Sequence, residues 1–128
     1  MRLTDGIFTA LCARNYAKKI KKIVEPSIAQ GTVSSLRYAR YLLRGPFPLG
    51  EAAIARDAGC SFDYAKQILH GRFELGEPAI AESAMWSFHY ASAVLHGPFP
   101  LGEDAIAEDG GIYTGWYAQL LAALKQTP

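Results

Sequence analysis

Histidines, cysteines and glutamates are the residues of this chain whose chemistry could support catalysis or metal binding. The histidines are His70, His89 and His96, and a glutamate recurs every 26 residues from Glu51. A zinc site needs about four Cys, His or carboxylate ligands at close spacing, and no histidine has such neighbours. The chain also lacks a nucleophile elbow, a phosphate-binding glycine loop and a Cys-x-x-Cys pair. We therefore predict a non-enzymatic protein with no catalytic residues, no metal and no cofactor.

The same residues have structural explanations. His70 and His96 precede a glycine at the end of an expected helix, as Arg44 does, and a cation there interacts favourably with the helix dipole. The recurring glutamates fall at expected helix starts, where a carboxylate is stabilised for the same reason. Cys12 and Cys60 lie on apolar columns and are interpreted as reduced core thiols. We therefore expect these histidines, glutamates and cysteines to belong to the structural scaffold.

A repeat of 26 residues organises the chain. Short motifs and single residues recur at this offset, and one inserted residue near Gly110 shifts the last copy. A degenerate earlier copy, residues 25–29, is in register with residues 77–81. Fixed periods of about 20–50 residues are typical of stacked supersecondary units. The recurring residues are Tyr38-Ala39, Tyr64-Ala65, Tyr90-Ala91 and Tyr117-Ala118; Gly45, Gly71 and Gly97; Phe47, Phe73 and Phe99; and the triplets Leu-Gly-Glu and Ala-Ile-Ala.

Each unit is predicted to contain two short helices. The first is expected to begin at an N-cap serine (Ser35, Ser61 or Ser87) and to close with a left-handed glycine (Gly45, Gly71 or Gly97). The second is expected to begin near Glu51, Glu77 or Glu103, with Ala-Ile-Ala as its buried rib. The loop Phe and Leu are expected to fill the gap between the helices. The fold class is therefore all-α, a small α-solenoid of stacked helix pairs.

The chain is expected to form a single domain, residues 1–128, with tandem repeats over 25–118. Residues 7–24 are predicted to form a basic amphipathic helix that caps one end of the stack, because apolar residues recur at i, i+4 spacing. Residues 112–125 are predicted to cap the other end. The apolar positions of the N-terminal helix are Phe8, Cys12, Tyr16, Ile20 and Val24.

Composition limits the function classes. The 128 residues are 50% hydrophobic with a net charge of +1, which excludes a disordered chain. We find neither an apolar run of about 18 residues nor a signal peptide, and expect a cytoplasmic protein that does not engage a membrane. Residues 1–44 hold nine Lys/Arg and two Asp/Glu, whereas residues 45–128 hold four and ten. The chain is therefore basic at one end and acidic over the rest.

The repeat pattern Y-A-x-x-(V/I/L)-L-x-G-(R/P)-F-x-L-G-E-x-A-I-A resembles short helical repeats in proteins of bacteriophages and large DNA viruses. Residues 70–77 match it best, and Pro46 and Pro98 replace the arginine in the neighbouring copies. The resemblance covers residues 25–118. It implies a small phage-type inhibitor of a host defence complex, anti-CRISPR-like in role and located in the host cytoplasm.

Variable positions on the first helices are the candidates for partner binding. If shared columns build the scaffold, columns that differ between units should face outward, and stacking should align them into one surface for a protein partner. The alternative is a solvated ladder in which Arg37 pairs with Asp63. The candidate partner-binding residues are Arg37, Tyr41, Arg44, Asp63, Gln67, His89 and Trp116.

Nucleic-acid binding is the alternative function. Clustered cations on the N-terminal helix and the first repeat could neutralise several phosphates, although the acidic remainder would repel the same polyanion. That acidic remainder would instead suit a basic, nucleic-acid-handling host complex. The candidate nucleic-acid-binding residues are Arg14, Lys18, Lys19, Lys21, Lys22 and Arg40.

Overall fold

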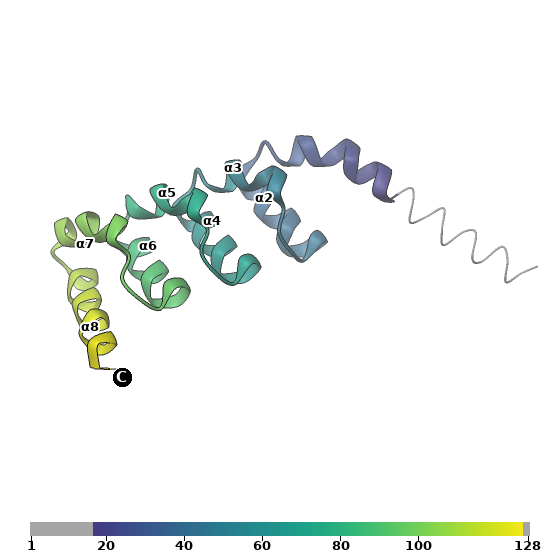
Figure 1. Ribbon diagram of the computed structural model, residues 1–128. Helices are drawn as coiled ribbons and strands as arrows, with labels where there is room; N and C mark the ends of the chain where they lie inside the picture. The colour runs from purple at the N-terminus through teal and green to yellow at the C-terminus, as the bar shows by residue number, and fades with distance from the viewer. Residues whose placement is uncertain (1–16, 127–128) are drawn as a thin grey trace, which may run out of the picture.

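The computed structural model describes residues 17–126, and their regular structure is entirely helical. Residues 17–28 form one helix, and three units of 26 or 27 residues follow before the last helix. Figure 1 shows α2, α4 and α6 side by side, with α3, α5 and α7 in a second row above them. The bounds are α2 Thr32–Arg37, α3 Glu51–Ile54, α4 Ala58–Asp63, α5 Glu77–Ala81, α6 Ala84–His89, α7 Glu103–Asp109 and α8 Ile112–Gln126. The predicted all-α solenoid is confirmed.

The first helix of each unit changes its winding halfway along. The α-helical turns of α2, α4 and α6 continue into π-helical turns that begin at the recurring tyrosine: η1 Tyr38–Leu43, η3 Tyr64–Leu69 and η5 Tyr90–Leu95. A loop and a short 3-10 turn follow, at η2 Pro48–Gly50, η4 Glu74–Gly76 and η6 Pro100–Gly102. The second helix then begins at the recurring glutamate, as predicted.

The prediction of a left-handed glycine at the end of the first helix is wrong. The left-handed residues are Arg44, His70 and His96, with φ of 53°, 55° and 52°. The following glycines instead donate their N–H groups six residues back, as Gly71 does to the Ala65 carbonyl at 3.1 Å. Arg44, His70 and His96 therefore end the first helices through their left-handed backbone conformation, whatever their side chains contribute through the helix dipole.

The predicted N-cap serines are also inside the helices. Ser35, Ser61 and Ser87 are fully buried, and each hydroxyl donates at 3.0 Å to the carbonyl of the isoleucine seven residues earlier. The caps lie one turn upstream, where Asp57 accepts from the Cys60 N–H at 2.8 Å and Ser83 from the Trp86 N–H at 3.3 Å. Each buried serine thus joins a first helix to the helix before it.

The core consists of the repeated columns. The tyrosines of Tyr-Ala are at most 6% exposed, and Ile54, Ile80 and Ile106 at most 2%. Phe47, Phe73 and Phe99 are at most 3% exposed, so the loop phenylalanines fill the gap as predicted. The loop leucines do not: Leu49, Leu75 and Leu101 are 57–62% exposed. The tyrosine, isoleucine and phenylalanine columns are therefore buried as predicted, and the loop leucine column is not.

Hydrogen bonds join each unit to the next through a tyrosine. The Tyr64 hydroxyl donates to Glu51 Oε2 at 2.7 Å and accepts from the Phe47 N–H at 2.9 Å. Tyr90 repeats this arrangement with Glu77 and Phe73 at 2.6 and 2.9 Å. The same bonds connect Tyr117 to Glu103 and Phe99, and Tyr38 to Glu25. The recurring glutamate therefore serves as the acceptor for a buried hydroxyl of the following unit.

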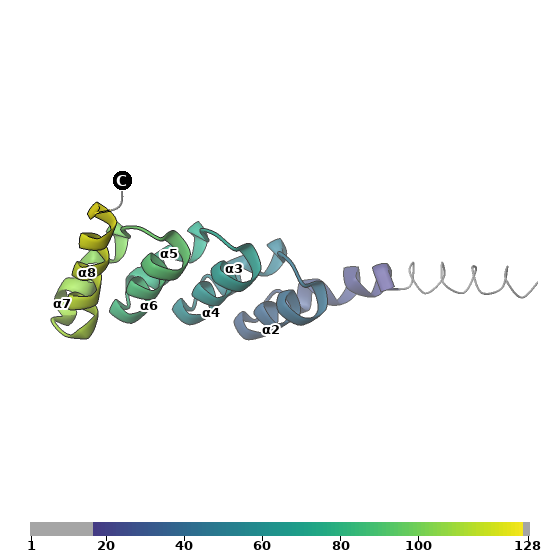
Figure 2. The same cartoon turned by 90° about the horizontal axis from the view of Figure 1, so that it is seen from below.

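The two ends of the stack differ. At the N-terminal end, residues 17–28 form a helix whose last part occupies the place of a second helix. Its first part extends straight away from the stack (Figure 1). The predicted capping helix, residues 7–24, lies only partly within the described residues, and Phe8, Cys12 and Tyr16 lie outside them. At the C-terminal end α8 covers α6 and α7, close to the predicted 112–125. Figure 2 shows α8 lying across this end.

Candidate partner-binding groove

The predicted partner-binding columns lie at the junctions between units. The His89 ring lies 6.1 Å from the Phe62 ring of the preceding first helix, and the Trp116 ring lies 5.7 Å from Phe88. These contacts leave His89 half-buried; Asp63 is half-buried as well, while Gln67 is exposed. The column therefore does not form one continuous outward surface, because His89 and Trp116 each pack against the unit before them.

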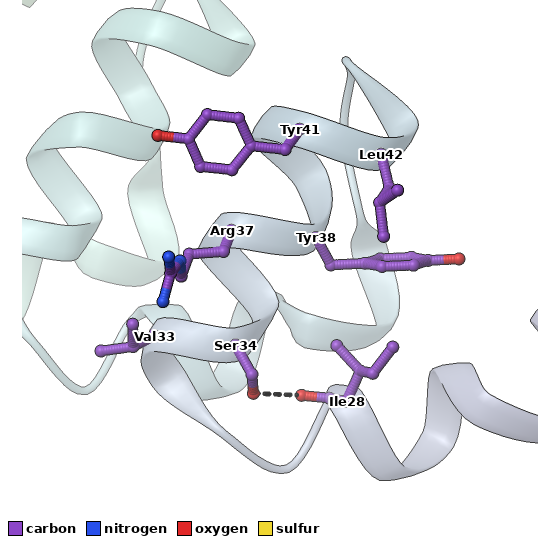
Figure 3. A pocket seen from close by; sticks show the side chains of 7 residues that line it. All are labelled: Ile28, Val33, Ser34, Arg37, Tyr38, Tyr41 and Leu42. Atoms are coloured by element: carbon purple, nitrogen blue, oxygen red, sulfur yellow. Dashed lines mark hydrogen bonds between the residues drawn. The ribbon is translucent and has the colours of Figure 1, made fainter.

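Within residues 17–126, no preceding unit lies against the same face of α2. The result is a groove of about 610 Å³ at the N-terminal end of the stack, shown in Figure 3. Its apolar side chains come from three segments, since Ile28 ends the preceding helix, Val33 lies on α2 and Leu42 lies on η1. The residues that line it are Ile28, Val33, Ser34, Arg37, Tyr38, Tyr41 and Leu42.

Burial along the columns shows why the groove is open. Leu42 is 72% exposed, whereas the corresponding Ile68 and Val94 are half-buried against the core. Tyr41 is 61% exposed and Val33 57%. Exposing large apolar groups costs about 25 cal/mol per Å² relative to burying them. Covering this end of the stack with another apolar surface would therefore be favourable. A second hollow next to it is lined by Ile20, Val24, Ile28, Tyr38 and Leu42.

Two arginines at the groove have no carboxylate partner among the described residues. Arg37 lines it, and the Arg40 guanidinium lies 5.7 Å from the centroid of the Tyr41 ring. The ion pair found within residues 17–126 is Arg72–Glu77, at 2.9 Å. The alternative in which Arg37 pairs with Asp63 is therefore not observed. The groove combines an apolar floor with uncompensated positive charge.

The other basic candidates lie on exposed surface. Lys18, Lys19, Lys21 and Lys22 are exposed on the helix 17–28, and Arg40 and Arg44 are exposed on or after η1. Arg14 lies outside the described residues. Trp116 is 45% exposed on α8, at the opposite end of the stack from Arg37 and Tyr41. The structure thus brings Arg37 and Tyr41 together and separates them from Trp116.

The remaining titratable groups belong to the scaffold. Among the described residues no group of three or more His, Cys, Asp or Glu could hold a metal ion. Burial raises the pKa of Cys60 to about 11, with a contribution from its hydrogen bond to Asp57. Burial and the bond to Glu103 raise the pKa of Tyr117 to about 12. No described helix is long and apolar enough to cross a membrane.

Sequence reasoning missed five of the seven groove residues, which are Ile28, Val33, Ser34, Tyr38 and Leu42. Ile28, Tyr38 and Leu42 sit on columns that are scaffold within the stack, so the repeat pattern alone does not mark them for binding. Val33 shares its column with Met85 and Ile112, which are also exposed. The useful signal is the position of the first unit, because a column in the first unit loses the neighbour that covers it elsewhere.

Comparison with known proteins adds no family. No protein-family model matches the chain, and no curated protein or solved structure matches it either. Function is therefore inferred from the groove and from the charges around it.

Proposed function

We propose that this protein is a non-enzymatic protein-interaction module that binds its partner through the groove on the first unit. The observation that carries the proposal is the open apolar face at this end, where Tyr41 and Leu42 are 61% and 72% exposed. Exposed aromatic and aliphatic groups beside an arginine are typical of the residues that dominate binding energy at protein interfaces.

The rigidity of the stack supports this role. The shared tyrosines, phenylalanines and isoleucines are buried, and hydrogen bonds connect the units through residues 25–117. A rigid scaffold presents its surface with little loss of conformational entropy on binding. Solenoids commonly bind partners in this way.

The biological setting that we propose follows the viral resemblance. The protein would act in the host cytoplasm as a small phage-type inhibitor of a host complex, in the manner of anti-defence or anti-CRISPR proteins. Its acidic units, residues 45–128, would favour encounter with a basic complex that handles nucleic acid, while the groove would provide a second, oppositely charged contact.

Site-specific photocrosslinking tests the proposal. A photoreactive phenylalanine analogue replaces Tyr41 in the full chain, and its matched control replaces Gln67, the same column one unit later. In bacterial lysate we expect one host protein to crosslink from position 41, not from 67, and to be displaced by excess unmodified chain. The purified host protein should then bind the purified chain. If position 41 gives only the products of position 67, the groove is not the binding site.

Nucleic-acid binding is retained as the second candidate because Lys18, Lys19, Lys21 and Lys22 are exposed on one helix. If this function is correct, duplex or single-stranded DNA should bind with an affinity that falls steeply with salt. Binding should then be lost in the variant Lys18→Glu/Lys22→Glu. Salt-independent or absent binding would reject this candidate and leave the protein partner.

A further inference from the structure

We infer that the groove binds an acidic amphipathic helix of a partner protein, which takes the place that a preceding first helix has at each internal junction. This inference rests on the proposed function and specifies the part of the partner that docks. Three observations support it: the internal junctions, the charges around the groove, and the residues that this chain could itself supply.

The internal junctions show the shape of the missing element. The Phe62 ring of α4 lies 5.4 Å from Trp86 and 6.1 Å from His89 on α6. One unit later, the Phe88 ring of α6 lies 5.7 Å from Trp116 on α8. In both cases a bulky apolar side chain on one helix covers the face that remains open on α2. The natural occupant of the groove is therefore a helix with one large apolar anchor.

The charges show what should flank that anchor. Arg37 and Arg40 lie at the groove, and Lys21 lines the adjoining hollow. None of the three is in an ion pair within residues 17–126. The carboxylate of Glu25 lies nearby, but it accepts the hydrogen bond of the Tyr38 hydroxyl at 2.7 Å. Carboxylates on the incoming helix would pair with these cations and fix its register.

The chain itself does not supply such a helix. Its acidic helix α7 keeps Ile106 only 2% exposed, so α7 has no free apolar anchor to offer to a second copy. The exposed helix 17–28 carries four lysines, which would repel the same arginines. Residues 1–16 contain two arginines and a single aspartate. A partner protein is the source that charge complementarity favours.

A second copy also cannot extend the stack with the internal geometry. Within the stack a Cβ on Gly76 would collide with Ser61, so the two segments touch only because the residue is glycine. In the copy that would follow α8, the corresponding residue is Val24, which would meet Thr114. The internal junction therefore cannot be reproduced between copies.

A designed peptide tests the inference. The probe is a fluorescein-labelled, helix-stapled peptide of residues 84–95 that keeps Phe88 and carries Met85→Glu, His89→Glu and Ser92→Glu. The controls are the same peptide with lysine at those three positions and the acidic peptide with Phe88→Ala. Fluorescence anisotropy with the full chain should show saturable binding of the acidic peptide. Both control peptides should bind at least about tenfold more weakly.

Variants of the chain locate the binding. Tyr41→Ala and Arg37→Glu/Arg40→Glu should each weaken binding about tenfold or more, and these side chains are exposed enough that folding should be unaffected. The matched controls Gln67→Ala and Lys66→Glu, one unit later, should leave binding within about twofold.

Several results would overturn the inference. No saturation by about 1 mM, equal binding of the lysine peptide, or insensitivity to Tyr41→Ala would each do so. A dimer in sedimentation that Tyr41→Ala dissociates would assign the groove to a second copy instead. If the peptide fails while position 41 still crosslinks to a host protein, the interaction module stands and the acidic helix does not. If the peptide binds without any crosslinked host protein, the groove chemistry stands and the proposed host partner does not.

Discussion

The contact between Gly76 and Ser61 provides a sharp test of the stacking. An ideal Cβ built on Gly76 would lie 2.5 Å from Ser61 Cβ and 2.7 Å from Phe73 Cδ2, and would also collide with the Ser61 hydroxyl. Neither neighbour is a flexible side-chain end, because both are buried in the core. Gly76→Ala should therefore push α5 away from α4.

The magnitude follows from three contributions. Overpacking a tight contact costs about 1–3 kcal/mol. Turning the buried Ser61 hydroxyl away from the Ile54 carbonyl adds about 1–3 kcal/mol if that bond is lost. The backbone of Gly76, at φ −90° and ψ −8°, is accessible to alanine, so reduced entropy of the unfolded chain returns about 0.4–1 kcal/mol. Together these contributions lead us to expect that Gly76→Ala lowers the free energy of unfolding by about 1–6 kcal/mol.

Urea unfolding followed by far-UV circular dichroism measures this change. The matched control is Gly71→Ala, where a Cβ would meet nothing within 4 Å and φ is not positive. That variant should be neutral or slightly more stable. Adding Ser61→Gly to Gly76→Ala should recover part of the loss, because it removes the side chain that the new methyl group would strike. Equal midpoints for the Gly76 and Gly71 variants would refute the close approach of the helices.

Three further predictions concern the hydrogen-bonded and titrating groups. Glu77→Gln weakens the acceptor of the Tyr90 hydroxyl within a buried network and should cost about 1–3 kcal/mol in urea unfolding. Removing the exposed partner of Glu77 by Arg72→Ala should cost clearly less, because solvent screens that ion pair. An equal cost for both would contradict this assignment. Because the pKa of Tyr117 is raised from 10.0 to about 12, the folded state holds a proton that the unfolded state releases, so stability should be complete below pH 10 and fall as the pH rises toward 12. The melting temperature of Tyr117→Phe should be lower at neutral pH and decline less over this interval, and parallel curves would argue against it. The raised pKa of Cys60, about 11, predicts modification by a thiol reagent at pH 8 roughly a hundredfold slower than for an unperturbed thiol, measured by mass spectrometry of the Cys60 peptide. Rapid labelling there would reject a protonated, shielded thiol.

The repeat period predicts the core because identical residues at identical offsets occupy identical environments. The repeat alone is enough to predict that Tyr64, Ile80 and Phe99 lie in the core. The predicted roles of Ser61 and His70 are wrong for a physical reason. A serine hydroxyl can accept a hydrogen bond from a helix N–H or donate one to a distant carbonyl. The local sequence does not show that the Ile54 carbonyl lies within reach of Ser61. Likewise, the π turn before His70 moves the left-handed residue one position earlier than a glycine-based cap predicts.

The candidate site is predictable in part. Arg37 and Tyr41 differ from their counterparts in the later units, which marks them in the sequence, and both line the groove. Leu42 belongs by its column to the scaffold, together with Ile68 and Val94. The pattern along a column gives the average environment of its members. It does not show that the first member has lost the helix that covers the others.

The tyrosine bond that crosses each junction makes the units interchangeable. The donor in one unit and the acceptor in the previous one are 13 residues apart at Glu51–Tyr64 and again at Glu77–Tyr90. Excising residues 58–83, or inserting a second copy of them, would join the same donors to the same acceptors. Gene duplication could therefore lengthen or shorten this protein and keep its tyrosine–glutamate bonds. The side chains that meet at a junction would change, since Leu36 would replace Phe62 against Trp86 after the excision. The groove on α2 would be carried along unchanged.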